Sequence, residues 1–191
     1  AEQTGAVMIA YEKVLIKVPP AATIVVGDVN STIACALAAK KLSLTVAHLE
    51  AGLRSRDREM PEEINRIVTD SISDILWTPS PDADKNLLIE GIALERITRV
   101  GNVMLDSYEL MRPHIEAESD LQEFGLDKKR FGIVTLHRPS NVDNEETLVS
   151  ILSALKTSAT IVPLLFPLHP RTRRNMENYN LLNDFLSAPG I

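Results

Sequence analysis

Short apolar runs of strand length alternate along this chain with segments whose apolar residues recur at helical spacing. The runs predicted as strands are residues 22–27, 44–48, 75–78, 97–100, 131–136 and 161–166. The segments predicted as helices are residues 2–17, 31–42, 61–73, 81–90, 103–116 and 145–156, with one or two short helices in 170–187. Because strands that alternate with helices of this length form mostly parallel sheets, the sequence predicts an α/β fold.

The most charged and least apolar stretch of the 191 residues lies between Glu116 and Arg130, directly before a predicted strand. A change of composition of this kind marks a domain boundary. We therefore expect part of an N-terminal domain over residues 1–116, a linker over 117–130 and the start of a C-terminal domain over 131–191. Two parallel strands with one crossover do not bury both faces of a sheet, and the first helix lacks a preceding strand. Both domains are therefore expected to be incomplete in this chain.

Several function classes are excluded by the spacing of a few residue types. The closest two of the eight glycines are seven residues apart, so no dinucleotide fingerprint, P-loop or nucleophile elbow occurs. The four histidines do not form the H-E-x-x-H zinc motif. The single cysteine, Cys35, permits no internal disulfide, which suits a reducing cytoplasm. We expect a cytoplasmic protein without a metal or a nicotinamide cofactor.

Neither nucleic acid nor a membrane is an expected partner. The formal net charge of −6 provides no global positive field for a phosphate backbone. No apolar run approaches the roughly 20 residues of a membrane-spanning helix.

Polar residues cluster at five places where predicted strands give way to helices. The clusters are GDVNST at 27–32, HLEAGLR at 48–54, RSRDREMPEEINR at 54–66, TLHRPSN at 135–141 and PLHPRTRR at 167–174. Parallel sheets bind ligands at the carboxyl ends of their strands. Five such clusters in two successive α/β units predict a cleft between two domains, with carboxylates on one side and His and Arg side chains on the other.

The clusters of the first domain also have structural explanations. In the structural explanation of the first cluster, Asp28 closes a turn and Asn30 or Ser31 caps the next helix. Glu50 has the residue type for proton transfer, or else forms an ion pair with Arg54 or Arg56.

The third cluster contains the start of a helix. Pro61 is well placed as its first residue, and carboxylates at 62 and 63 complement the helix dipole. Glu62 and Arg66 are four residues apart, so they share a face on which they pair or line a polar ligand.

The clusters of the second domain are basic. In a functional interpretation, the imidazole of His137 transfers protons near neutral pH and Arg138 binds a phosphate. A loop histidine that hydrogen-bonds to backbone groups explains His137 equally well. His169 precedes a run of arginines. These side chains bind a phosphate, or they are the solvated residues at the start of a helix.

Six blocks taken together resemble the non-hydrolysing UDP-N-acetylglucosamine 2-epimerases, in order and along essentially the whole chain. The blocks are GDVNST at 27–32, HLEAGLRS at 48–55, MPEEINR at 60–66, GNVMLD at 101–106, TLHRPSN at 135–141 and PLHPRT at 167–172. The resemblance implies two Rossmann-like domains in the glycosyltransferase-B arrangement, a homodimer in the complete protein, and interconversion of UDP-GlcNAc and UDP-ManNAc without NAD or metal. It also implies a role in cell-surface polysaccharide biosynthesis.

The resemblance assigns roles to individual residues. The implied catalytic residues are Asp28, Glu50, Glu62 and His137, and the implied substrate or effector contacts are Arg66, Arg138 and His169. Many members have an Arg-Glu pair where this chain has Pro139-Ser140, so the substrate or its regulation is expected to differ. Two alternatives stay open: a hydrolysing epimerase that releases UDP and ManNAc, and a non-catalytic module that binds nucleotide sugars.

Overall fold

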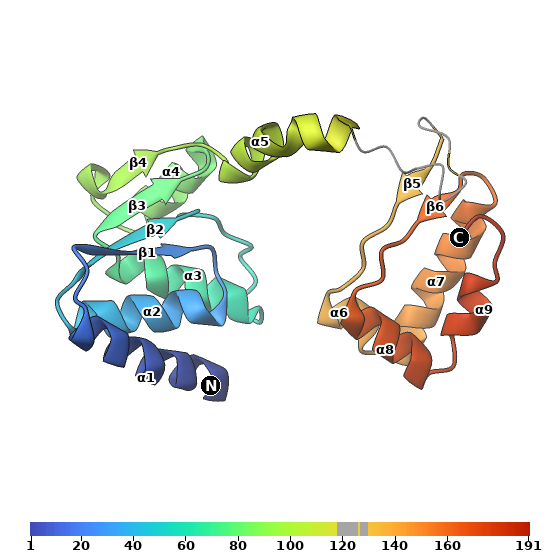
Figure 1. The fold of residues 1–191 in the computed structure, drawn as a ribbon, viewed down its shortest axis with the longest axis horizontal. Helices are drawn as coiled ribbons and strands as arrows, with labels where there is room; N and C mark the ends of the chain where they lie inside the picture. The colour runs from blue at the N-terminus through green and yellow to red at the C-terminus, as the bar shows by residue number, and fades with distance from the viewer. Residues whose placement is uncertain (118–125, 127–129) are drawn as a thin grey trace. The chain divides into compact units, whose positions relative to one another are not determined.

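The computed structural model describes residues 1–117, 126 and 130–191 of the chain. These residues belong to two compact units, Ala1–Pro113 and His114–Ile191 (Figure 1). Most of the predicted linker, residues 117–130, lies outside the described residues.

The first unit contains a four-stranded parallel sheet with the order β1-β2-β3-β4. Its elements are α1 (Glu2–Lys17), β1 (Ala22–Val26), α2 (Asn30–Lys41), β2 (Thr45–Leu49), α3 (Pro61–Ile72), β3 (Ile75–Thr78), α4 (Pro81–Ile89), the 3₁₀ helix η1 (Leu94–Arg96), β4 (Ile97–Arg99) and α5 (Val103–Ala117), which crosses the unit boundary. The predicted parallel α/β fold is confirmed here, with strand and helix ends within one or two residues of those expected.

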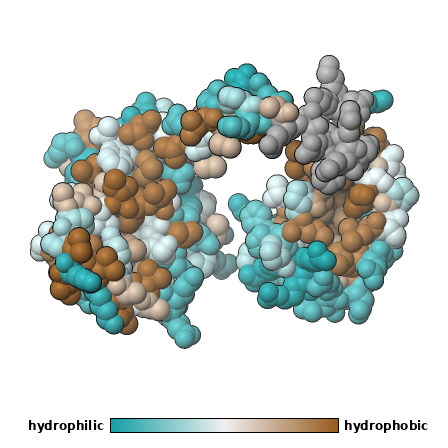
Figure 2. Space-filling view, viewed as in Figure 1, coloured by the Kyte–Doolittle hydropathy of each residue, from teal (hydrophilic) through white to brown (hydrophobic). Residues whose placement is uncertain are grey.

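The strand order places the connecting helices on one face of the sheet. Each strand pairs with the next one in sequence, and right-handed crossovers that always advance in one direction lie on the same side. Val25, His48 and Leu76 are in register and buried on that side. On the other side Ile24 is 58% and Val26 50% exposed, and Figure 2 shows hydrophobic residues gathered on this unit.

The second unit is built around two short parallel strands and their helices. Its elements are β5 (Gly132–Ile133), α6 (Pro139–Val142), α7 (Glu145–Ala159), β6 (Leu164–Leu165), α8 (Pro170–Asn178) and α9 (Leu182–Leu186). Its core contains Val142, Leu148, Leu152, Met176 and Phe185. The sequence predicted six-residue strands at 131–136 and 161–166, whereas regular pairing covers only two residues of each. Pro163 has no N–H and so cannot donate to a ladder at the start of the second run.

Two local predictions at helix starts are corrected by the structure. Neither Asn30 nor Ser31 caps α2: the helix begins at Asn30, and Val29 is its N-cap without a side-chain bond. The Asn30 amide instead donates to Gln3 at 2.8 Å. The short helix α6 was not expected, and it begins at Pro139, whose ring fixes the backbone angle that a first helical residue needs.

Candidate active site

The ends of β1 and β2 bring Asp28 and Glu50 to neighbouring turns. Val26 and Leu49 are in register, and the Gly27 N–H donates to the Leu49 carbonyl at 3.0 Å. A Cβ atom placed on Gly27 would lie 3.3 Å from Glu50 Oε2. The Glu50 carboxylate therefore lies directly against the turn that carries Asp28.

Glu50 has an unusual backbone conformation and a carboxylate that stands apart from the ion pairs around it. Its φ of +69° lies in the left-handed region, where a non-glycine residue costs roughly 1–2 kcal/mol. Within the described parts of the chain, no hydrogen bond or ion pair engages its carboxylate. The alternative that Glu50 pairs with Arg54 or Arg56 is therefore wrong: Arg54 binds Asp70 and Glu90, and Arg56 contacts Asn86 at 3.4 Å. A half-buried carboxylate held in this way is available to a ligand.

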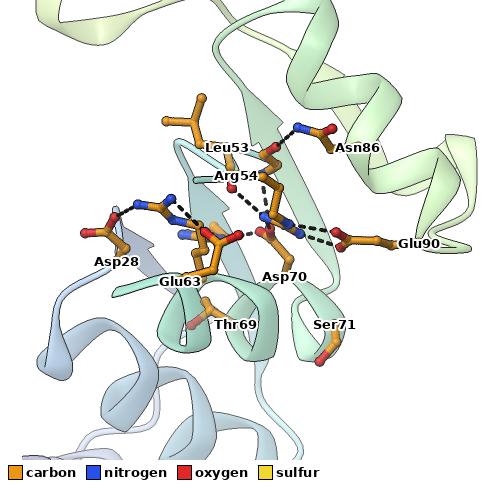
Figure 3. A network of polar contacts seen from close by, with 12 residues as sticks. Asp28, Leu53, Arg54, Glu63, Thr69, Asp70, Ser71, Asn86 and Glu90 are labelled. Atoms are coloured by element: carbon orange, nitrogen blue, oxygen red, sulfur yellow. Dashed lines mark hydrogen bonds and ion pairs between the residues drawn. The ribbon is translucent and has the colours of Figure 1, made fainter. Parts of the chain in front are cut away.

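Asp28 is held by residues of α3, one of the helices that cover the sheet. The Arg66 guanidinium forms an ion pair with Asp28 Oδ2 and a second one with Glu63 at 2.9 Å. The Asn65 amide donates to the Asp28 carbonyl at 2.8 Å, and at 3.2 Å to Asn30. Figure 3 shows Asp28 and Glu63 within one set of polar contacts. Asp28 is consequently oriented and kept next to a positive charge.

The two glutamates at the start of α3 have different environments. Glu63 is 2% exposed and accepts the backbone N–H groups of Ser55 and Arg56, both at 2.9 Å. Burial alone would raise the pKa of Glu63, but these donors and the Arg66 charge outweigh it, so the pKa is below the ordinary value. Glu62 is exposed, and the predicted pairing of Glu62 with Arg66 does not occur because Arg66 turns to Asp28 and Glu63.

A buried charge network lies beneath these turns. His48 is fully buried, with Nε2 2.8 Å from the Gly27 carbonyl oxygen and Nδ1 2.6 Å from Asp70. Asp70 also accepts from Arg54 at 2.7 Å, and Arg54 reaches on to Glu90 (Figure 3). Burial alone would lower the pKa of Arg54, but its hydrogen bonds to Glu90 and Asp70 raise it above the ordinary arginine value.

Sequence reasoning missed this network and the role of Glu63. A signal was present: Glu63, Arg66 and Asp70 are spaced by three and four residues, which places three charges on one face of a helix. That face points to the sheet, so the charges had to pair with one another or with groups on the strands.

The second unit brings two of the predicted residues together. The rings of His137 and His169 have centroids 5.6 Å apart. His137 Nδ1 lies 3.3 Å from the Thr135 hydroxyl, and His169 accepts the Arg171 N–H at 3.2 Å as the N-cap of α8. Arg138, the N-cap residue of α6, is exposed next to His137.

A polar surface cavity of about 480 Å³ adjoins His169. Its lining residues are Asp143, His169, Pro170, Arg171, Arg174 and Asn175. The hydrogen bonds of Arg171 hold the pKa of Asp143 below its usual range. The cavity therefore combines imidazole and guanidinium groups, as an anionic ligand requires.

The structure thus assembles Asp28, Glu50 and Arg66 within the first unit and His137 with His169 within the second. The cleft between the two units stays a prediction. Across residues 1–117, 126 and 130–191, no group of three or more His, Cys, Asp and Glu side chains is arranged to hold a metal ion. No helix in the same part of the chain is long and apolar enough to cross a membrane.

A family model described as UDP-N-acetylglucosamine 2-epimerase matches residues 1–188. The chain belongs to this family. A UDP-N-acetylglucosamine 2-epimerase homolog from Methanococcus maripaludis is 47% identical over 181 residues, which cover 94% of this chain and 50% of the relative. A UDP-2,3-diacetamido-2,3-dideoxy-D-glucuronate 2-epimerase from Pseudomonas aeruginosa is 43% identical over 184 residues, covering 94% and 51%.

Structural comparison gives the same family. The crystal structure of Methanocaldococcus jannaschii UDP-GlcNAc 2-epimerase in complex with UDP-GlcNAc and UDP matches with a TM-score of 0.88 and 41% identity, covering 97% of this chain and 52% of that one. The epimerase structures that match have a glycosyltransferase-B-like fold, so the predicted fold class is confirmed. The chain spans about half the length of these 2-epimerase relatives.

Proposed function

We propose that the full-length protein carrying this chain interconverts UDP-GlcNAc and UDP-ManNAc. The observation that carries the proposal is the pair of carboxylates at the ends of β1 and β2: Asp28 held by Arg66, and Glu50 beside it, whose carboxylate has no hydrogen-bond or ion-pair partner among the described residues. Similarity to a UDP-GlcNAc 2-epimerase from Methanocaldococcus jannaschii, 42% identical over 196 residues, supports the substrate.

The proposed reaction is an elimination followed by a re-addition. The C2 proton of the sugar is not adjacent to a ketone, so direct enolisation is unavailable. A base removes that proton, the C–H electron pair forms the C1–C2 double bond, and the C1–O bond breaks as UDP leaves with its electron pair. A proton is then delivered to the opposite face of C2, and UDP adds again at C1.

The residues of the site fit this sequence of steps. Proton removal on one face and delivery on the other need acid–base groups on both faces, and the candidates we propose are the carboxylates Asp28, Glu50 and Glu62 together with His137. The departing diphosphate develops negative charge, and Arg66, Arg138 and His169 are the proposed groups that stabilise it. We further propose that the complete protein acts as a cytoplasmic homodimer in cell-surface polysaccharide synthesis, as the family resemblance implies.

The test is a product assay with the full-length protein in deuterated water. UDP-GlcNAc should give UDP-ManNAc that carries deuterium at C2, with the sugar still attached to UDP. Free ManNAc and UDP as the accumulating products would instead identify the hydrolysing reaction. Binding of UDP-GlcNAc without any turnover would identify a non-catalytic module and contradict the proposal.

One relative makes a second substrate worth including in that assay. The Pseudomonas aeruginosa protein that is 43% identical is a 2-epimerase of UDP-2,3-diacetamido-2,3-dideoxy-D-glucuronate. The reacting atoms at C1 and C2 are the same in both sugars. Turnover of the diacetamido uronate at a much higher kcat/KM than UDP-GlcNAc would assign the chain to that substrate.

A further inference from the structure

We propose that the buried His48–Asp70 pair is a positioning device that holds the turns of Asp28 and Glu50 in one geometry, with His48 doubly protonated. The inference rests on the proposed function for its catalytic consequence, whereas its geometry stands on the contacts below. Neither residue was singled out by its sequence motif as a site residue.

The ring of His48 has hydrogen-bond acceptors on both sides. Nε2 lies 2.8 Å from the Gly27 carbonyl oxygen, which only accepts, so Nε2 carries a proton. Nδ1 lies 2.6 Å from Asp70 Oδ1. The other oxygen of Asp70 accepts the Gly52 N–H at 3.1 Å and Arg54 at 2.7 Å, which favours an ionised carboxylate. Nδ1 is then the donor as well, and the ring is an imidazolium.

Each end of the pair is attached to one of the two turns. The Gly27 carbonyl belongs to the planar peptide group that joins Gly27 to Asp28. The hydrogen bond from His48 therefore fixes the orientation of the peptide plane that precedes Asp28. The Gly52 N–H closes the turn that begins at Glu50, and Asp70 holds it. One buried pair therefore sets the separation of two turns that come from different strands.

The turn after β2 needs such support because Glu50, which has a side chain, has left-handed backbone there. Gly27 has a φ of +65°, Glu50 of +69° and Gly52 of +80°. A non-glycine residue stays in this region only when its surroundings determine it. Asn86 adds a third support, because its amide donates to the Gly52 carbonyl at 2.9 Å.

The charges of the network balance within the described residues. Arg54, whose side chain is 4% exposed, lies between Asp70 and Glu90. His48 and Arg54 supply two positive charges, and Asp70 and Glu90 supply two negative ones. A neutral His48 has one N–H, so beside an ionised Asp70 one ring nitrogen would turn its lone pair toward an acceptor: Nδ1 toward Asp70 at 2.6 Å, or Nε2 toward the Gly27 carbonyl at 2.8 Å. Only the doubly protonated ring donates to both acceptors.

The test compares two histidine substitutions in the full-length protein. His48→Gln places an amide donor near the position of Nε2 and can keep the bond to the Gly27 carbonyl. His48→Asn places it near Nδ1 and keeps only the bond to Asp70. We expect His48→Asn to lower kcat about 100-fold, which is the effect of displacing a catalytic group by about 1 Å. KM should stay within about threefold of that of the unmodified protein. The kcat of His48→Gln should be about tenfold higher than that of His48→Asn.

Asp74→Asn is the matched control. Asp74 also binds a cation and a backbone N–H, accepting from Lys40 at 2.7 Å and from Val46 at 2.8 Å, but it lies at the start of β3, away from the site. Its kcat should stay within about threefold of the unmodified protein. An equal loss of kcat in Asp74→Asn and His48→Asn would mean general loosening of the unit and would overturn the proposal.

Nuclear magnetic resonance gives a readout that does not depend on activity. With ¹⁵N-labelled histidine at pH 7–8, both ring nitrogens of His48 should be protonated, and His48→Asn should shift the amide signals of Asp28 and Glu50 whereas Asp74→Asn should not. A neutral ring, or unmoved amides at both turns, would overturn the proposal. If the unmodified protein turned over no UDP-linked amino sugar, the proposed function would fail while these signals still decided the positioning.

Discussion

Two adjacent glutamates show that helix phase decides a residue's role. Glu62 and Glu63 both follow Pro61 in the first turn of α3, and their sequence motif treats them alike. Successive helical positions are rotated by about 100°, so one side chain meets the sheet side and the other meets solvent. Glu63 became the anchor of the loop at residues 55 and 56, and Glu62 stayed exposed.

At the scale of these residues, Glu50→Gln and Glu62→Gln should each lower turnover of the full-length protein by roughly 10²–10⁴, the usual contribution of a general acid–base group. The fold should survive because Glu50 lies in the turn after β2, Glu62 is exposed at the start of α3, and neither belongs to the core. Steady-state rates with UDP-GlcNAc measure the effect. Glu59→Gln, an exposed glutamate of the same loop, is the control. A rate within about threefold for either variant would remove that residue from the catalytic set.

Glu63 should instead act on stability and on its pH dependence. Glu63→Gln removes a charged acceptor from two backbone N–H groups and Arg66, which should cost about 2–3 kcal/mol of unfolding free energy at pH 7. Because the folded-state pKa of Glu63 is lowered, its contribution is complete above the unfolded value of about 4.3 and is lost as the pH falls through the folded value. Urea unfolding of both proteins between pH 7 and pH 3 checks this. A difference that stayed constant down to pH 3 would contradict it.

At the scale of elements, the site depends on how closely α4 approaches the turn after β2. A Cβ on Gly52 would lie 2.4 Å from the Ala83 carbonyl oxygen of α4, and φ at Gly52 is +80°. Only glycine fits there, so the turn that carries Glu50 and the helix after β3 are packed against each other without space for a methyl group.

A pair of glycine substitutions separates backbone strain from this contact. Gly91 has a φ of +83° but open space around it, so Gly91→Ala should lose about 1–2 kcal/mol from strain alone. Gly52→Ala should lose about 1–3 kcal/mol more, because the methyl group has to displace α4. Denaturant midpoints of the two variants give the comparison. Equal losses of unfolding free energy in the two variants would show that α4 moves away from the methyl group without an energetic cost.

At the scale of the whole molecule, the proposed reaction needs only acid–base groups and positive charge for the diphosphate. Neither a glycine-rich dinucleotide turn nor a zinc protease motif occurs in the sequence. Treatment of the full-length enzyme with EDTA, or removal of NAD, should therefore leave the epimerisation rate unchanged. Activity that returned only with a divalent metal ion would contradict the elimination mechanism proposed here.

The 191-residue chain by itself should be marginally stable and inactive. It spans about half the length of its relatives and exposes Ile24 and Val26 on one face of its sheet. Apolar surface left in water forgoes roughly 25 cal/mol per Å², so a few hundred Å² is comparable with a small net stability. We expect self-association in sedimentation, weak or absent UDP binding in calorimetry and no turnover. A cooperative monomer with micromolar UDP affinity and turnover would contradict this expectation.

The sequence by itself determined the fold class and the positions of the polar turns. Hydrophobic periodicity depends on local spacing, so the strands and helices of the first unit lie within a residue or two of their predicted ends. Motif order along the chain was sufficient to identify the family, which the match over residues 1–188 confirms. Regular strands in the second unit were overestimated, because strand length depends on a partner and not on composition alone.

Only the tertiary structure decided which charges pair. Arg66 was within reach of Glu62 along the helix, but the fold brought Asp28 next to it from the turn after β1. The ion pairs of Arg66 with Asp28 and Glu63 replaced that local pair. Arg54 was likewise drawn to Asp70 and Glu90 and does not pair with Glu50. His48 became part of the support of two turns because β1 and β2 are in register at Val25. Pairing of buried charges depends on distances between segments far apart in sequence, and those distances are set only when the sheet and helices pack.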